Sequence, residues 1–351
     1  MRRTPILAVL VGVVVALVAI PGFVKLDKPN SDGLFYEVQR LEVEGHSEAE
    51  ATRTVFDGAI ARQTAHIEDD PGHVRRVLDP HWVEYSKRFY RRRWLVPAVA
   101  AAVAPIVGEH PGRALRWASL LGYLLIAPVL FLLLRRRFPA LLSAALAVAC
   151  TLAPPVYKWS LGMRVDSWGL LLEALGLLAA VLWLVIVEWR SRAARRVNLA
   201  LLGSGIAAAL PAFVLGGTPV RDQLAYVITG YKIPEDTSWS FIGAHYMDQL
   251  WRTIRSDFSY PTDFPLPVTV ILYAGLAVAV VALVAVMLRR ARGDPYFSLA
   301  KAAIPGCFVL LLLANNAQAF RLELIFVPIA AIGLAIIAMR VPVTARVATL
   351  A

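Results

Sequence analysis

The predicted fold depends on the run WLVPAVAAAVAPIVG at residues 94–108. The run is apolar, but it is shorter than the roughly 20 residues that an α-helix needs to cross a bilayer. Three arginines come directly before it, and two prolines lie inside it. If the run crossed, the next apolar segment would leave the basic cluster 135–137 on the outer side, against the positive-inside rule. We therefore expect a short helix over 94–108 that lies in the outer membrane interface.

The rest of the chain has the composition of an integral membrane protein. Of its 351 residues, 58% are hydrophobic and only 17% are charged. Apolar runs long enough to cross a bilayer recur along the sequence, which predicts an all-α polytopic protein with about eight transmembrane helices in a single domain, 1–351. The predicted spans are 5–24, 117–134, 139–157, 168–188, 197–217, 268–288, 302–320 and 322–340.

Basic residues set the predicted orientation. With 94–108 outside the membrane, the clusters 135–137, 190–196 and 289–292 and both termini all fall on the cytoplasmic side. The net charge of +11 is then explained by orientation and by contact with anionic lipid, so no nucleic-acid partner is expected. Two long segments, 25–116 and 218–267, lie on the outer face. These features predict a multi-pass protein of the plasma (inner) membrane, with its active face periplasmic or extracellular.

The first outer segment contains two helix-start signals. Ser47 with Glu50 forms a capping box, which predicts a helical stretch to about Gln63. Asp79 followed by Pro80 predicts a second helix start.

The stretch Ser31-Asp32-Gly33-Leu34-Phe35-Tyr36-Glu37 follows the first span closely. Asp32 is expected at the membrane surface, and the aromatic pair Phe35 and Tyr36 suits the interfacial aromatic belt. The alternative is that Asp32 caps a helix or occupies a turn before Gly33.

Two further acids belong to the predicted span 168–188 and its outer end. Asp166 is either a functional carboxylate or an N-cap, whereas Glu173 lies within the span, where an ionisable group normally faces protein or a wet cavity. Their spacing places both on one helix face, roughly 10 Å apart. Together with Asp32 they offer the oxygen ligands that Mg²⁺ or Mn²⁺ prefers.

Arginines on the outer face are candidates for phosphate binding. Arg92 beside the interfacial run, Arg164 near Asp166, and Arg321 at a corner between two spans can each donate charge-assisted hydrogen bonds. Simple headgroup anchoring is the alternative for Arg92. The sequence has no Gly-Lys-Ser/Thr phosphate loop and no nucleophile elbow. The two cysteines, Cys150 and Cys307, both fall in apolar runs and are expected to be buried thiols.

In this order the features resemble the GT-C superfamily of membrane glycosyltransferases, which use polyprenyl-phosphate sugar donors. The similarity is carried by Asp32 after the first span, Arg92 with Pro97 at the short outer helix, Arg164 with Asp166 before a later span, and Arg321 before the last one. It covers the first half of the chain and its last hairpin.

The resemblance implies transfer of a sugar from a polyprenyl-phosphate donor to an acceptor hydroxyl, with inversion, in cell-envelope glycan assembly. It assigns Asp32 as the general base, Asp166 as a second catalytic acid, and Arg92, Arg164 and Arg321 to the donor phosphate. Glu37 and Glu173 would give acid or metal support. The implied partners are the polyprenyl-linked sugar, membrane lipids, and a glycan, lipid or protein acceptor.

Two other classes of function remain open from the sequence. A transporter or lipid flippase would use Glu173 and the amides at 315–318 along its path. A non-catalytic membrane scaffold would use the Trp- and Tyr-rich segment 218–267 as a docking surface.

Overall fold

The computed structural model describes residues 3–25, 30–67, 77–91, 93–108, 110–136, 138–153, 220–230 and 232–259, with a few isolated positions between 156 and 175. All the regular structure in these residues is helical, which confirms the all-α class for the described part of the chain. Four predicted spans, 197–217, 268–288, 302–320 and 322–340, lie wholly outside these residues, and 168–188 lies almost wholly outside them.

Two of the described helices are long and apolar enough to cross a membrane. They are α1, Arg3–Lys25, and α8, Arg113–Arg135. Each has 23 residues and therefore a length of about 35 Å, which exceeds the roughly 30 Å of a bilayer's apolar core. They coincide with the predicted spans 5–24 and 117–134. Helix α9, Ala140–Leu152, is shorter than the predicted span 139–157.

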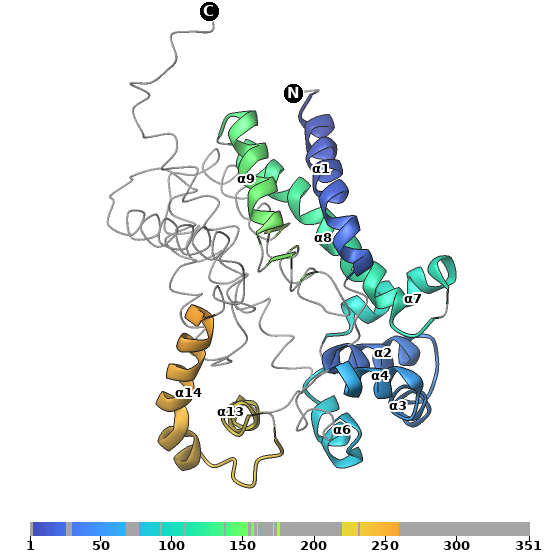
Figure 1. The fold of residues 1–351 in the computed structure, drawn as a ribbon, viewed down its shortest axis with the longest axis vertical. Helices are drawn as coiled ribbons and strands as arrows, with labels where there is room; N and C mark the ends of the chain where they lie inside the picture. The colour runs from blue at the N-terminus through green and yellow to red at the C-terminus, as the bar shows by residue number, and fades with distance from the viewer. Residues whose placement is uncertain are drawn as a thin grey trace, which may run out of the picture.

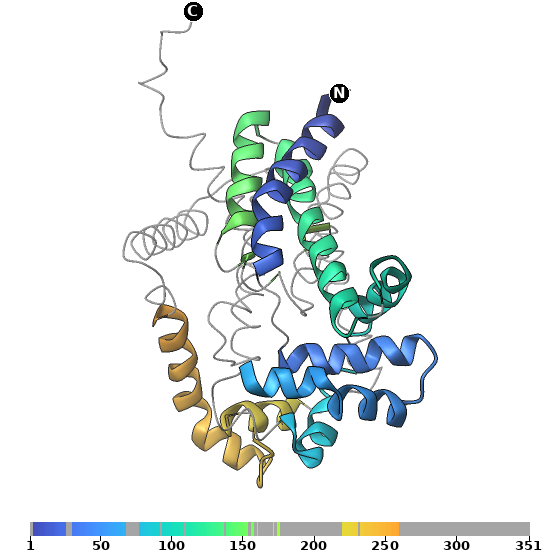
Figure 2. The same cartoon turned by 45° about the vertical axis from the view of Figure 1, so that its right-hand side comes forward.

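Helices α1, α8 and α9 pack together as a bundle (Figures 1 and 2). Near one end, Arg116 donates a hydrogen bond of 2.8 Å to the carbonyl oxygen of Phe23. Further along, Gly12 lies against Pro128, so closely that a Cβ on Gly12 would be 3.0 Å from Cγ of Pro128. Late residues of α1 therefore meet early residues of α8, and the two helices run antiparallel.

Helix α9 completes this bundle through contacts with both other helices. The hydroxyl of Tyr123 in α8 donates a buried hydrogen bond of 2.8 Å to the carbonyl oxygen of Thr151 near the end of α9. Most side chains buried between the helices are apolar, and α1 contributes small ones, including Ala8, Val11, Val15 and Ala19. Small side chains let helix backbones approach closely, which favours packing in an apolar environment.

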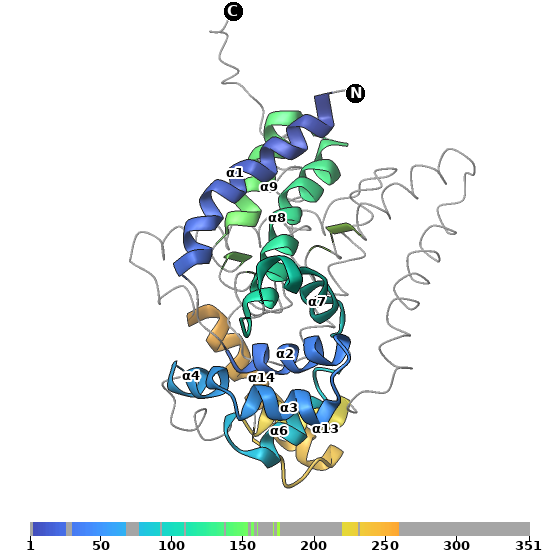
Figure 3. The ribbon, with the colours of Figure 1, turned by 90° about the vertical axis from the view of Figure 1, so that its right-hand side faces the viewer.

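A second group of helices follows α1 and lies at one end of the bundle (Figure 3). Its members are α2, Ser31–Val43; α3, Glu48–Phe56; α4, Ala59–Ile67; α6, Pro80–Lys87; and α7, Leu95–Val107. Helix α2 is central, because it contacts α3, α4, α7 and α8. Its side chains Leu34, Phe35 and Val38 form a core with residues of the surrounding helices.

The capping signals are confirmed, but the length of the helix after Ser47 was wrong. The hydroxyl of Ser47 accepts from the backbone N–H of Glu50, and the carboxylate of Asp79 accepts from that of His81. The stretch predicted to continue to Gln63 breaks at Gly58 into α3 and α4. The turn is tight, because a Cβ on Gly58 would lie 2.5 Å from the carbonyl oxygen of Thr54.

The short helix predicted over 94–108 is confirmed as α7. Its 13 residues span about 20 Å, which is too short for a perpendicular crossing. It packs against α2 and α8, with Val96, Ala100 and Ala104 buried. Ile106 near its end is 85% exposed. One face of α7 therefore packs against protein, and another face exposes apolar side chains.

The second of the two segments predicted to be outer, 218–267, packs against the first, 25–116. It contains α13, Val220–Ile228, and α14, Trp239–Ser259. The hydroxyl of Tyr226 in α13 lies 3.1 Å from that of Ser86 in α6, and its ring stacks on Phe89 at a centroid distance of 4.8 Å. The two segments predicted on the outer face are thus in contact.

One expectation for α2 is wrong. The rings of Phe35 and Tyr36 were predicted to lie in the interfacial belt, but both are at most 2% exposed. They are covered because α3, α6 and the turn after α6 close over α2. Their aromatic surface is used for packing rather than for contact with lipid headgroups.

Candidate functional site

The candidate site is built around the first turn of α2. Asn30 caps this helix, and its side-chain oxygen accepts a hydrogen bond of 2.9 Å from the backbone N–H of Gly33. Asp32 is therefore not the capping residue, and it belongs to the first turn rather than to a separate turn. An acidic side chain is favoured there by the helix dipole. The carboxylate follows the end of α1 by only seven residues.

A tyrosine from the turn after α6 donates a hydrogen bond to this carboxylate. The hydroxyl of Tyr90 donates a hydrogen bond of 2.7 Å to Oδ1 of Asp32. Tyr90 lies in the turn after α6, where its backbone N–H donates to the carbonyl of Lys87 and its own carbonyl accepts from the N–H of Arg93. These two bonds fix the turn and with it the direction of the phenol.

Aromatic packing positions the same phenol from two sides. The ring of Phe35 stacks on Tyr90 with centroids 4.4 Å apart and planes 7° apart. The ring of Tyr36 meets Tyr90 edge-on at 5.4 Å. Stacked and edge-on pairs each add about 0.5–1.5 kcal/mol beyond their area burial. Asp32 and the two aromatics that hold its partner thus come from a single helix.

A guanidinium completes the group, which we call the Asp32–Arg93 cluster: Asp32, Phe35, Tyr36, Tyr90 and Arg93. Nη1 of Arg93 donates a hydrogen bond of 2.8 Å to the hydroxyl of Tyr36, and its guanidinium carbon lies 5.6 Å from the centre of the Tyr90 ring. A carboxylate and a guanidinium are thereby attached to one pair of tyrosines. This arrangement combines a proton acceptor with a group suited to an anion.

Burial and charge both act on Tyr90. Burial, followed by the negative charge of Asp32, raises the pKa of the Tyr90 phenol well above its usual range. The phenol therefore stays protonated at neutral pH and remains a donor to Asp32.

The arginine run 91–93 is divided among different partners. Arg91 donates from Nη2 to both carboxylate oxygens of Glu48 in α3, at 3.0 and 3.1 Å. Arg93 binds Tyr36, as described above. Arg92, the predicted phosphate ligand, lies outside the described residues. The sequence therefore located the basic run, but it did not identify Arg93 as the member that bonds Tyr36 in the Asp32–Arg93 cluster.

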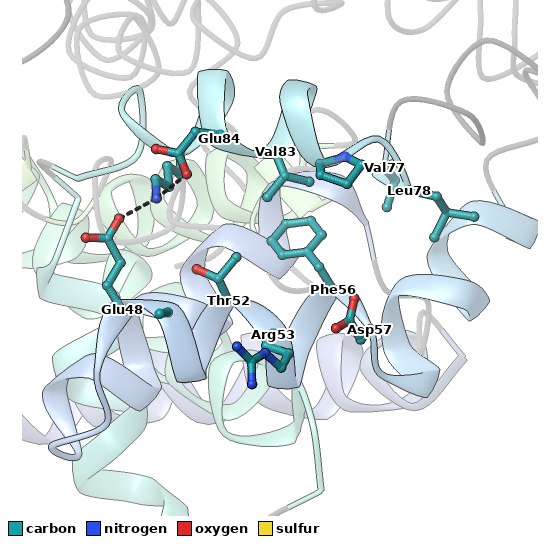
Figure 4. A pocket seen from close by; sticks show the side chains of 12 residues that line it. Glu48, Thr52, Arg53, Phe56, Asp57, Val77, Leu78, Val83 and Glu84 are labelled. Atoms are coloured by element: carbon teal, nitrogen blue, oxygen red, sulfur yellow. Dashed lines mark ion pairs between the residues drawn. The ribbon is translucent and has the colours of Figure 1, made fainter.

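A pocket of about 530 Å³ lies between α3 and α6 (Figure 4). At one side Lys87 bridges Glu48, at 2.6 Å, and Glu84, at 2.5 Å. The hydrogen bond from Lys87 is the main cause that lowers the pKa of the Glu48 carboxyl, and Arg91 adds to it. Lys87 and the two glutamates pair with one another, and the Lys87–Glu48 pair links α6 to α3.

Glu37, the proposed acid support, lies on a different side of α2 from Asp32. Five residues correspond to about 140° around a helix. Its Oε1 accepts a hydrogen bond of 2.8 Å from Arg40. The structure therefore does not bring Glu37 into the Asp32–Arg93 cluster.

The other predicted site residues, Asp166, Glu173, Arg164 and Arg321, lie outside the described residues. Within the described ranges, no group of three or more His, Cys, Asp or Glu side chains is arranged to hold a metal ion. A metal bound by Asp32 with Asp166 or Glu173 stays a prediction.

Tyr90 and Arg93 were missed as site residues. Their sequence signal is position alone, since Tyr90 comes directly before the basic run 91–93 and Arg93 is the last member of that run.

No protein-family profile, no curated protein sequence and no solved structure matches this chain. Function is therefore inferred from the residues of the chain itself.

Proposed function

We propose that this chain is a multi-pass membrane glycosyltransferase, which moves a sugar from a polyprenyl-phosphate donor to an acceptor hydroxyl on the outer face. The observation that carries the proposal is the Asp32–Arg93 cluster. It places a held carboxylate and a guanidinium immediately after the first apolar helix, where a lipid-linked phosphate would reach them.

The membrane setting is supported by the outer surface of α1. This helix exposes a nearly continuous set of large apolar side chains: Ile6, Val9, Leu10, Val13, Val14, Leu17, Val18 and Ile20. A patch of this kind is unfavourable in water and is expected to face lipid. The proposed orientation is supported by the antiparallel packing, because Arg3 of α1 and Arg135 of α8 lie at the same end of the bundle.

In the proposed reaction, Asp32 is the general base that acts on the acceptor hydroxyl. Its carboxylate takes the proton of the hydroxyl that attacks the anomeric carbon, as the bond from that carbon to the lipid phosphate breaks. A single direct displacement inverts the anomeric centre. The charge that develops on the departing phosphate is stabilised by outer-face arginines, for which Arg92, Arg164 and Arg321 stay our candidates. Tyr90 acts as a positioning residue, because it holds Oδ1 of Asp32.

Lipid analysis tests the donor. We would extract the protein in mild detergent and identify co-purified lipids by mass spectrometry, for the wild type and an Arg92/Arg164/Arg321→Ala variant. A matched control is Arg53/Arg62/Arg221→Ala, since these three outer arginines are exposed. A polyprenyl phosphate present in wild type and control but depleted in the first variant supports the proposal. Bulk phospholipid alone in every sample contradicts it.

The identified donor then allows a direct assay of the base. Asp32→Asn is expected to lower transfer by about 10²–10⁴-fold while the protein stays folded. Asp248→Asn is the matched control, because Asp248 is exposed on α14. Undiminished transfer by a folded Asp32→Asn protein would remove Asp32 from the mechanism.

A non-catalytic docking function is the second candidate, and α14 favours it. Trp239, Met247 and Trp251 on this helix are each more than 60% exposed. They are spaced by multiples of four and so lie along one side of the helix. If combined loss of Asp32, Asp166 and Glu173 left the cellular phenotype unchanged while loss of these three side chains abolished it, docking would be the better account.

A further inference from the structure

Phe89 and Tyr90 are adjacent in the turn after α6, and they contact two different parts of the chain. The hydroxyl of Tyr90 donates to Asp32 of α2, as described above. The ring of Phe89 stacks on Tyr226 of α13, with centroids 4.8 Å apart and planes 19° apart. One short turn therefore connects the carboxylate of Asp32 to a helix from a distant part of the sequence.

Tyr226 contacts this turn at a second point. Its hydroxyl lies 3.1 Å from that of Ser86 in the last turn of α6, in a buried contact. The backbone N–H of Phe89 donates to the carbonyl oxygen of Ser86 at 2.9 Å, so both residues belong to one hydrogen-bonded turn. A side chain that contacts both of them restrains the path of the chain as it leaves α6. The position of Tyr90, the next residue, depends on that path.

Neighbouring side chains hold Tyr226 in place. Its ring also meets that of Tyr85 in α6, at a centroid distance of 5.6 Å. The guanidinium carbon of Arg88 lies 3.9 Å from the centre of the Tyr85 ring, and Nη1 of Arg88 lies 3.8 Å from Oδ2 of Asp222 in α13. Tyr226 is 9% exposed, so its ring is packed on several sides. A side chain packed in this way can position its neighbours.

Electrostatics also place Tyr226 near the phenol of Tyr90. Burial, followed by the charge of Asp32, is the main cause that raises the pKa of Tyr90, and Tyr226 adds to the effect. Such a contribution requires the two phenols to lie close enough for their charges to interact.

We propose that Tyr226 is a positioning residue for Asp32. Through Ser86 and Phe89 it fixes the turn after α6, and the turn keeps the hydroxyl of Tyr90 on Oδ1 of Asp32. The inference rests on the proposed function, in which Asp32 is the general base, because a base must stay within hydrogen-bond reach of the acceptor hydroxyl. Helix α13 thereby contributes to the site through a residue that acts on Tyr90 rather than on the substrate.

A fluorine label at position 90 tests the positioning. The full-length protein is made with 3-fluorotyrosine in place of Tyr90, and its fluorine NMR signal is recorded in detergent micelles. Asp32→Asn removes the charged acceptor and thus defines the signal of a phenol that has lost this partner. We expect Tyr226→Leu to shift the signal toward that of Asp32→Asn. A signal unchanged from wild type in folded Tyr226→Leu would overturn the proposal.

Two further variants separate positioning from a general loss of stability. Tyr123→Leu removes another buried tyrosine, whose hydroxyl donates to a carbonyl in the α1–α8–α9 bundle, and it should leave the label's signal in place. An equal shift in Tyr123→Leu would contradict the proposal. If Tyr226→Leu does not fold, Tyr226→Phe takes its place, since it keeps the stack on Phe89 and loses the contact with Ser86. It should give a smaller shift in the same direction, and no shift would overturn the proposal.

Transfer kinetics give a second readout once the donor is identified. Tyr226→Leu should lower kcat by about 10–100-fold and leave KM for the donor nearly unchanged, because it displaces the base and not the donor phosphate. In the Asp32→Asn background, the same change should cause no further loss, since Tyr226 acts through Asp32. A further loss there would contradict this role. The fluorine signal requires no transfer, so it tests the positioning even if the proposed transferase activity is absent.

Discussion

The hydroxyl of Tyr90 and the carboxylate of Asp32 form a 2.7 Å hydrogen bond across 58 residues of sequence. Tyr90→Phe removes this bond and leaves the stack on Phe35 in place. Hydrogen bonds to charged groups contribute about 1.5–3 kcal/mol, so we expect a loss of stability in that range, measured by denaturant unfolding of the detergent-solubilised protein. A Tyr90→Phe protein as stable as wild type would mean that the bond makes no net contribution.

The raised pKa of Tyr90 predicts a dependence on alkaline pH. The unfolded phenol loses its proton near pH 10, whereas the folded phenol keeps it to higher pH. The unfolded state then binds fewer protons, so stability is present below pH 10 and falls as the pH rises further. Thermal denaturation from pH 8 to 11 should give a smaller decline in Tyr90→Phe than in wild type. Parallel declines would contradict this prediction.

Gly58 is expected to resist substitution. In Gly58→Ala the new Cβ would lie 2.5 Å from the backbone oxygen of Thr54. Because the close atom belongs to the backbone, no side-chain rotation can relieve this clash. We expect a loss of about 1–3 kcal/mol, as for other overpacked sites. Gly243→Ala is the matched control, because that helical glycine has open space around its Cβ position. It should be neutral or stabilising by up to about 1 kcal/mol.

Packing between α1 and α8 can be tested at one close approach. Gly12→Val places a branched side chain against Pro128, where even a Cβ is only 3.0 Å from Cγ. Separation of the two helices should lower the melting temperature and increase proteolysis of the solubilised protein. Val13→Leu on the exposed side of α1 should have little effect. Equal melting temperatures for the two variants would argue against this contact.

Cysteine labelling tests the proposed orientation. In a background with Cys150 and Cys307 replaced by serine, Asp57→Cys and Arg136→Cys lie at opposite ends of the described structure. A membrane-impermeant maleimide applied to intact cells should label position 57 and spare position 136 until the membrane is opened. The reverse pattern would place the Asp32–Arg93 cluster on the cytoplasmic side.

Local signals in the sequence predicted local structure well. The apolar lengths of α1 and α8, the short run that becomes α7, and the caps at Ser47 and Asp79 all depend on nearby residues. The break at Gly58 was missed because a glycine inside a helical pattern does not reveal how closely a carbonyl approaches.

The candidate site depends on contacts that a linear pattern does not contain. Asp32 could be predicted from its position after the first span. Its partner Tyr90 could not, because the packing of α6 against α2 is what brings Tyr90 to Asp32. The burial of Phe35 and Tyr36 also depends on this packing. The sequence alone does not distinguish an aromatic residue that faces lipid from one that faces protein.

The hydrogen bond from Arg116 to the carbonyl of Phe23 has a consequence for biosynthesis. The two residues are 93 positions apart, so α1 leaves the ribosome well before its partner helix exists. In the proposed membrane setting, α1 can remain in lipid during that interval, because its contact face is made of the apolar side chains Ala8, Val11, Val15 and Ala19. The helices α2 to α7 are translated during the same interval. The residues of the Asp32–Arg93 cluster all precede α8, but the core around Phe35 and Tyr36 includes Ala114, Leu115 and Ala118 of α8, so this core is completed only after α8 has been made.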